Sequence, residues 1–142
     1  LTNLELKARV DVLYEWYNMQ VDIEARTLFR MLQTQVLPAS IRYQTELADA
    51  SASLQAAGME STEVDAELTQ LMQLIRELRS AGQELRKAIE DTPENLEKHA
   101  THARDVVLPA MARARAASDA LEEHLPEDQW PLPSYSDLLF QR

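Results

Sequence analysis

Residues 62–91 read TEVDAELTQLMQLIRELRSAGQELRKAIED, and this stretch decides the fold. Its apolar residues recur at alternating intervals of four and three positions, which is the spacing of a helix that packs along one seam. The other face is charged, as expected for a helix surface in water. The stretch therefore predicts a long amphipathic helix, with Gly82 as a point where a partner helix could approach closely. The predicted seam consists of Val64, Leu68, Leu71, Ile75, Leu78, Gly82, Leu85 and Ile89.

A second long helix is predicted upstream, over about residues 4–56. Apolar residues keep helical spacing on both sides of Pro38, and Gly58 follows as a stop signal. A proline inside a helix costs about 3 kcal/mol, so we expect this helix to be bent near Pro38. Ser61 or Thr62 can cap the helix that follows. The predicted buried stripe begins with Leu6, Val10, Leu13 and Tyr17.

A third helix is predicted over about residues 93–125, with Thr92 as its N-cap and Pro93 in its first turn. Its seam is rich in alanine, which permits close helix contact. Residues 126–142 then form a proline-punctuated, extended tail with an apolar end. The predicted fold class is all-α. Residues 1–125 form three long helices in an antiparallel bundle or an extended helical coiled coil, and an irregular C-terminal tail follows.

The tetrapeptide Val-Leu-Pro-Ala occurs twice, at residues 36–39 and 107–110. Pro38 and Pro109 each lie about midway along a predicted helix. Because the flanking residues do not align, we interpret the two motifs as helix kinks; a duplicated hairpin and coincidence stay open as alternatives.

The composition excludes several classes of function. The chain has 142 residues and a net charge of −10, without a basic segment, whereas nucleic-acid binding needs clustered Lys and Arg. No apolar run approaches the roughly 18 residues that cross a bilayer, so we expect a cytoplasmic protein without a membrane partner. The chain has no cysteine, which excludes disulfides and thiolate sites. Leu1 at the first position suggests a segment of a longer chain.

Asp22, Glu24 and Arg26 are candidate site residues because they crowd an apolar part of the first helix. Helical spacing places at least one of them beside the apolar stripe, where an unpaired charge is costly. No nucleophile, phosphate loop or general base accompanies them. We therefore favour structural pairing, within the bundle or with another part of the protein, over a catalytic role.

Exposed aromatic and apolar side chains are the other candidates for contact. Trp16 lies off the predicted buried stripe, so contact with another domain or subunit is about as probable as a merely exposed ring. The tail is too apolar for a free linker and is expected to be ordered and to dock on the bundle or on a neighbouring subunit; mobility of a chain end is the alternative. Its apolar residues are Trp130, Tyr135, Leu138, Leu139 and Phe140.

His99, His102 and Asp105 invite a metal-site interpretation, since residues three apart share a helix face. The Glu-x-x-His pairs of di-iron bundles are missing, however, and the histidines flank a seam of alanines. We favour surface histidines over a metal site.

Three separated stretches resemble the C-terminal region of type III glutamine synthetases. The first lies within residues 20–44 and contains an Asp-Ile-Glu-Ala run, a Leu-Pro-Ala turn and Tyr43. The second is RDVVLPAM at residues 104–111, and the third is WPLPSYSDLLF at residues 130–140. The last is similar to the ending Trp-Pro-x-Pro-x-Tyr-x-Asp-Leu-Leu-Phe of the family. In this order the three stretches span nearly the whole chain.

The resemblance implies a parent enzyme that joins ammonia to glutamate at the expense of ATP, with divalent Mg or Mn, as a ring-shaped homo-oligomer. It also implies that the family's metal ligands and nucleotide site lie upstream of this segment. No catalytic, cofactor-binding or metal-binding residue is therefore assigned in this chain. The expected partners are the catalytic region of the same chain and neighbouring subunits.

Two functions follow from these observations. The first is a non-catalytic C-terminal helical domain of a type III glutamine synthetase, serving packing, oligomer assembly or regulation. The second is a free-standing helical interaction module. A catalytic region directly ahead of Leu1 in the open reading frame would decide for the first function, and a start codon there for the second. An independent helical metalloenzyme has little support.

Overall fold

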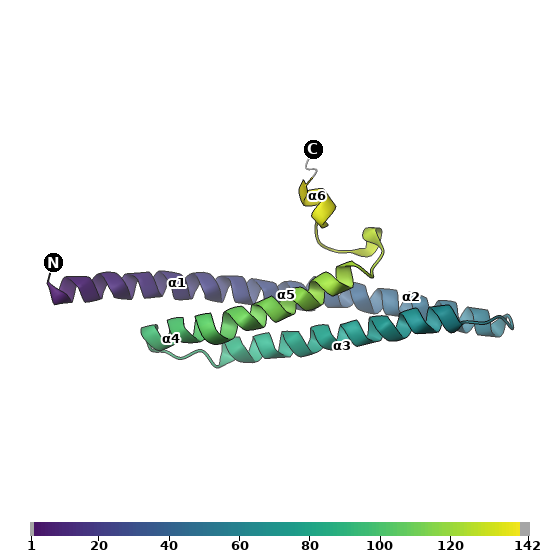
Figure 1. Ribbon diagram of the computed structural model, residues 1–142, viewed down its shortest axis with the longest axis horizontal. Helices are drawn as coiled ribbons and strands as arrows, with labels where there is room; N and C mark the ends of the chain where they lie inside the picture. The colour runs from purple at the N-terminus through teal and green to yellow at the C-terminus, as the bar shows by residue number, and fades with distance from the viewer. Residues whose placement is uncertain (1, 140–142) are drawn as a thin grey trace.

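The computed structural model describes residues 2–139 and shows three long helical rods lying side by side (Figure 1). The first rod consists of α1 (Asn3–Met31), the π-helical segment η1 (Leu32–Val36) and α2 (Leu37–Ala56). The second rod is α3 (Thr62–Glu90). The third consists of α4 (Leu96–His102), the π-helical segment η2 (Ala103–Val107) and α5 (Leu108–Glu122). The predicted all-α fold of long packed helices is confirmed, and no strand occurs within residues 2–139.

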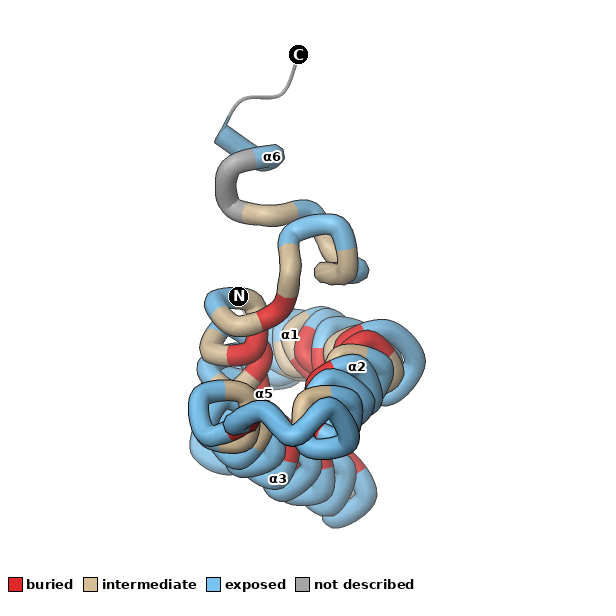
Figure 2. Tube along the Cα trace, turned by 90° about the vertical axis from the view of Figure 1, so that its right-hand side faces the viewer, coloured by how far each residue is buried: buried red, intermediate tan, exposed pale blue. Residues whose placement is uncertain are grey.

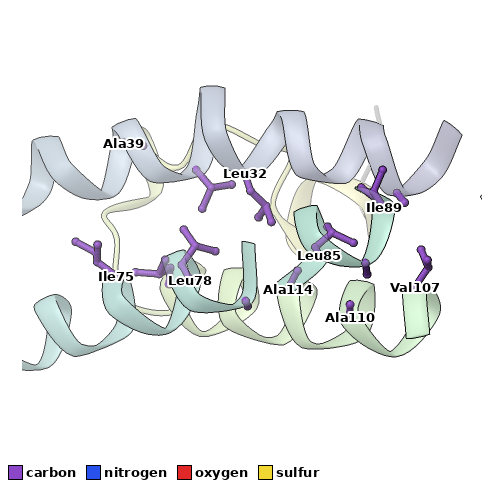
Figure 3. Packing of buried hydrophobic residues seen from close by; sticks show 14 of the residues in the cluster. Leu32, Ala39, Ile75, Leu78, Leu85, Ile89, Val107, Ala110 and Ala114 are labelled. Carbon is purple, nitrogen blue, oxygen red and sulfur yellow. The ribbon is translucent and has the colours of Figure 1, made fainter. Parts of the chain in front are cut away.

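The hydrophobic core runs along the line where the three rods meet, as Figures 2 and 3 show. Leu71, Leu78 and Leu85 of α3 are each at most 2% exposed, so the predicted seam of this helix faces the core. The first rod supplies large side chains, whereas the third rod supplies mainly alanines, which let α5 pack closely on α3. The core residues of these two rods include Leu32, Val36, Ala39, Ala103, Val107, Ala110 and Ala114.

A polar network closes the hairpin between α2 and α3. Gly58 adopts a φ of 73°, a left-handed conformation that glycine tolerates and that ends α2. The hydroxyl groups of Ser51 and Ser61 both donate hydrogen bonds to the carboxylate of Asp65. These two bonds hold the pKa of Asp65 below its usual value. The network therefore ties the end of α2 to the first turn of α3.

A second contact between α2 and α3 predicts a pH dependence of stability. The hydroxyl of Tyr43 donates to Oε1 of Glu67 over 2.7 Å. Burial, the bond to Glu67 and the nearby carboxylates raise the pKa of Tyr43 to about 12. Because the folded pKa lies above the unfolded value of about 10, the contribution of Tyr43 is complete below pH 10 and is lost between about pH 10 and 12.

We therefore expect the difference in the free energy of unfolding between the unmodified chain and Tyr43→Phe to shrink over this pH range. Urea unfolding of both proteins at pH 9 and pH 11.5 measures the difference. A difference that stayed constant between the two pH values would contradict the assigned environment of the hydroxyl.

Both Val-Leu-Pro-Ala motifs follow a π-helical turn. The amides of Leu37 and Leu108, which precede the two prolines, donate to the carbonyls of Leu32 and Ala103, five residues back. An ordinary α-helical turn would press a proline ring against the carbonyl four residues upstream, and the wider turn relieves this contact. Figure 1 shows that both rods continue through these turns. The motifs thus mark widened turns within continuous rods.

The third rod begins later than predicted. Asn95 is its N-cap and accepts a hydrogen bond from the amide of Lys98 over 3.0 Å. Thr92 instead donates to the carbonyl of Ile89 over 2.8 Å and so finishes α3. The assignment of Thr92 and Pro93 to the start of the third helix is wrong, because Thr92 caps the preceding carbonyls and leaves the capping position to Asn95.

Two further predictions about packing are corrected. Leu6 and Leu13 were expected in the buried stripe, but they are 54% and 69% exposed. The N-terminal end of α1 extends past the start of α4 (Figure 1), whereas Leu13 lines an open hollow together with Ala100 and Arg104. Gly82 was expected to allow a close helix approach, yet an added Cβ would lie 3.5 Å from the side-chain nitrogen of Gln33, an ordinary contact distance.

The tail is less extended than predicted. It contains the short 3-10 helix η3 (Glu127–Gln129) and the short helix α6 (Tyr135–Leu139). Pro126 lies just before η3, and Ser134 caps α6 by accepting a hydrogen bond from the amide of Asp137 over 3.1 Å. In Figures 1 and 2 the chain leaves the end of α5, and α6 stands away from the three long rods.

Candidate interaction surface

The outward face of α1 carries an apolar stripe. Val12, Trp16, Met19 and Ile23 follow one another at steps of four, three and four residues, which places them on one side of the helix. Each of these side chains is more than half exposed, and Trp16 is 65% exposed. We call these four residues the outer stripe.

The outer stripe lies opposite the face that packs on the bundle. Asn18, Val21 and Ala25 are the buried residues of α1, and helical spacing places them on the other side of the helix. A helix that is apolar on two opposite faces normally has a partner on each of them. The bundle covers only one of these faces.

The beginning of α1 extends this exposed surface. Every residue from Asn3 to Val10 is exposed, and Leu4, Leu6 and Val10 are the large apolar side chains among them. Figure 1 shows this end of α1 projecting past the start of α4. The chain therefore presents an apolar helical arm at one end of the bundle.

Of the three predicted charged residues, Asp22 alone has a charged or ionisable partner within residues 2–139. Nε2 of His99 lies 3.3 Å from the carboxylate of Asp22 and joins α4 to α1. One turn earlier, the side-chain amide of Asn18 donates to the carbonyl of Leu96 over 3.1 Å. Glu24 is exposed and accepts only a 3.4 Å bond from Gln20. Arg26 is exposed and makes no ion pair in the described part of the chain.

The two histidines of α4 serve different contacts. His99 is directed to Asp22, whereas Nε2 of His102 lies 2.6 Å from the carbonyl of Ala88 and must donate to it. Asp105 pairs with Arg104 over 2.8 Å, which lowers the pKa of Asp105. Among residues 2–139, no group of three possible metal ligands comes together. The interpretation of His99 and His102 as surface histidines is wrong, because both side chains are half-buried and connect helices.

Pro38 and Pro109 are half-buried and follow the π-helical turns. Their observed contribution is to the shape of the two rods.

The start of the tail contacts the bundle. Trp130 and Leu132 are partly buried against the core, and Gln129 donates to Glu46 over 2.9 Å. The indole nitrogen of Trp130 is buried and has no acceptor among residues 2–139. A groove of about 590 Å³ lies between α1, α5 and the tail. It is lined by Leu28, Met31, Arg115, Ser118, Asp119, Glu122, Trp130, Leu132, Pro133 and Leu138.

The end of the tail is described only in part. Leu138 and Leu139 of α6 are about 60% exposed. The side chain of Tyr135 and the whole of Phe140 lie outside the described residues. Docking of the tail is thus observed at Trp130 and Leu132, and Leu138 and Leu139 offer further apolar surface.

Sequence reasoning identified Trp16 but missed Val12, Met19 and Ile23. The missed signal is the second helical series in α1, offset from the buried one. The buried series of apolar residues already accounts for the helical period of this segment, and this masks the second series. Together these positions favour association with another apolar surface.

No helix within residues 2–139 has the length and apolarity that a bilayer crossing requires.

Comparison with known proteins identifies relatives. Residues 1–55 match the family model described as glutamine synthetase C-terminal domain. The whole chain is 31% identical to the type-3 glutamine synthetase of Dictyostelium discoideum, and 97% of it is 27% identical to a glutamine synthetase of Bacteroides fragilis. The chain spans about 20% of the length of each relative. No solved structure matches the chain significantly. The predicted resemblance is confirmed.

Proposed function

We propose, from this similarity to the C-terminal region of type III glutamine synthetases, that the chain is a non-catalytic helical domain of such an enzyme. The parent protein would be cytoplasmic and would ligate ammonia to glutamate at the expense of ATP. The domain would serve the packing and assembly of that protein, with regulation as a further role of the same contacts.

The observation that carries this proposal is the exposed arm of α1. Val12, Trp16, Met19 and Ile23 would gain free energy if removed from water, at roughly 25 cal/mol for each Å² of apolar area. Contiguous exposed apolar residues of this kind mark protein contact sites. The match to the glutamine synthetase C-terminal domain covers this arm, since it begins at residue 1 and ends at residue 55.

ATP and the divalent metal, Mg or Mn, would be held by the part of the enzyme outside this chain. Several of the titratable side chains described above instead connect helices of the bundle. Asp22 with His99 and Tyr43 with Glu67 are the main examples. These contacts connect neighbouring helices and stabilise the bundle.

Truncation of the complete enzyme tests the proposal. We expect a protein that ends directly before Leu1 to lose its oligomeric state by mass photometry and to lose most of its activity with it. We expect the 142-residue chain alone to be helical by circular dichroism and silent in a metal-dependent γ-glutamyl transfer assay. Activity in the isolated chain, or a truncated enzyme that assembled and worked normally, would contradict the proposal. The second outcome would favour a free-standing interaction module.

A further inference from the structure

We propose that the outer stripe of α1 is the surface on which the catalytic region of the same polypeptide packs. This inference rests on the proposed function and adds both the surface and its occupant. The stripe comprises Val12, Trp16, Met19 and Ile23, all more than half exposed on the side away from the bundle.

The geometry of the arm favours an occupant from the same chain. In an enzyme whose C-terminal domain this is, the catalytic region is joined through the N-terminal end of α1. That end is the projecting tip of the arm in Figure 1. A surface tethered so closely meets its partner at a high effective concentration, which favours contact within one polypeptide.

The shape of the arm agrees with this assignment. The outer face of the arm is apolar at Val12 and Trp16, and Leu4 and Leu6 are exposed apolar side chains near its tip, one on each side of the line of the stripe. A helix that merely linked two independent domains would be polar on its outer face. The arm is therefore suited to lie against the region from which it emerges.

Charge disfavours a second copy of this domain as the occupant. Each copy has a net charge of −10. Asp11 and Glu15 border the outer stripe on one side and Arg9 borders it on the other, so a pairing that sets like sides of two stripes together would bring carboxylates together. The same carboxylates would suit a partner surface that carries Lys or Arg beside an apolar patch.

Photo-crosslinking in the complete enzyme tests the occupant. The probe p-benzoylphenylalanine replaces Arg9, which borders the stripe, and a control protein carries it in place of the exposed Gln73 on α3. We expect the probe at position 9 to react with a peptide of the catalytic region while the product keeps the mass of one chain on a denaturing gel. A product with the mass of two chains would assign the surface to a neighbouring subunit and overturn the proposal.

Hydrogen exchange provides an independent measurement. We expect α1 from Leu4 to Ile23 to exchange at least tenfold more slowly in the complete enzyme than in the isolated 142-residue chain. The double variant Val12→Ser, Trp16→Ser should remove most of this protection, whereas Met59→Ser, at an exposed position in the hairpin, should not. Equal exchange in the complete enzyme and the isolated chain would overturn the proposal.

The two proposals fail separately. If truncation before Leu1 abolishes assembly but the double variant leaves exchange and assembly unchanged, the outer stripe is not the packing surface of the catalytic region. The proposed function of the domain is then still supported. If truncation changes neither assembly nor activity, the proposed function itself is wrong.

Discussion

Replacing Leu71 by aspartate is expected to unfold most of the isolated domain at 37 °C. Leu71 is 1% exposed and lies in the part of the α3 seam that packs against α2. The substitution removes about 2–3 kcal/mol of apolar burial and places a charge in the core, so we expect a total cost of about 4–6 kcal/mol. This is a large share of the roughly 5–15 kcal/mol that stabilises a typical domain. Circular dichroism during thermal and urea unfolding measures the loss.

Two matched variants make this prediction specific to the buried face. Leu71→Ala should cost about 2–5 kcal/mol and stay folded enough for a free energy to be measured. Glu77→Asp introduces the same side chain on the exposed face of the same helix and should stay within about 0.5 kcal/mol of the unmodified chain. If all three variants melted at the same temperature, the assignment of the helix faces would be wrong.

The fold could be predicted from the sequence because the strongest signals were local and periodic. The α3 seam from Leu71 to Ile89 repeats so regularly that only a helix with one buried face fits it. The ends of helices were harder, because neighbouring residues compete for the capping position. Thr92 and Asn95 are both good caps, and the preference of Thr92 for the carbonyls at the end of α3 decided between them.

Other features depended on where the rods stop relative to one another, which periodicity does not encode. Leu6 and Leu13 keep the spacing of buried residues but are 54% and 69% exposed. The half-buried contacts of His99 and His102 arise only when α4 lies beside both α1 and α3. The sequence therefore indicated that at least one of Asp22, Glu24 and Arg26 needs a partner, but it could not identify Asp22 and His99 as the pair.

The widened turns before Pro38 and Pro109 show how one local disturbance is accommodated. The positions of the two prolines predicted where the regular α-helix is interrupted, because proline cannot donate a backbone hydrogen bond inside a helix. Whether the chain breaks or inserts a π-helical turn depends on the packing on both sides. Val36 and Val107 are fully buried in the core just before the two prolines, so the rods remain anchored through each turn.

Deleting all residues after Glu127 is expected to destabilise the isolated domain by about 2–4 kcal/mol. The deletion removes Trp130 and Leu132, which are partly buried against the core beside the groove between α1 and α5. For a chain of this size the loss corresponds to a fall in melting temperature of roughly 5–15 °C.

A shorter deletion separates the anchor from the end of the tail. Ending the chain after Ser134 keeps Trp130 and Leu132 and removes α6 together with residues 140–142. Leu138 and Leu139 of α6 are exposed, so the melting temperature should fall by at most about 2 °C. If α6 instead contacts a neighbouring subunit, this shorter deletion should weaken the oligomer of the complete enzyme while leaving the isolated domain unchanged.

The anchoring role of Trp130 is contradicted if the longer deletion leaves the melting temperature unchanged and the tail amides exchange as fast as those of a free peptide. The indole nitrogen of Trp130 is buried without an acceptor among the described residues, so the cost of this unpaired donor offsets part of the gain from apolar contact and limits the expected effect of the longer deletion.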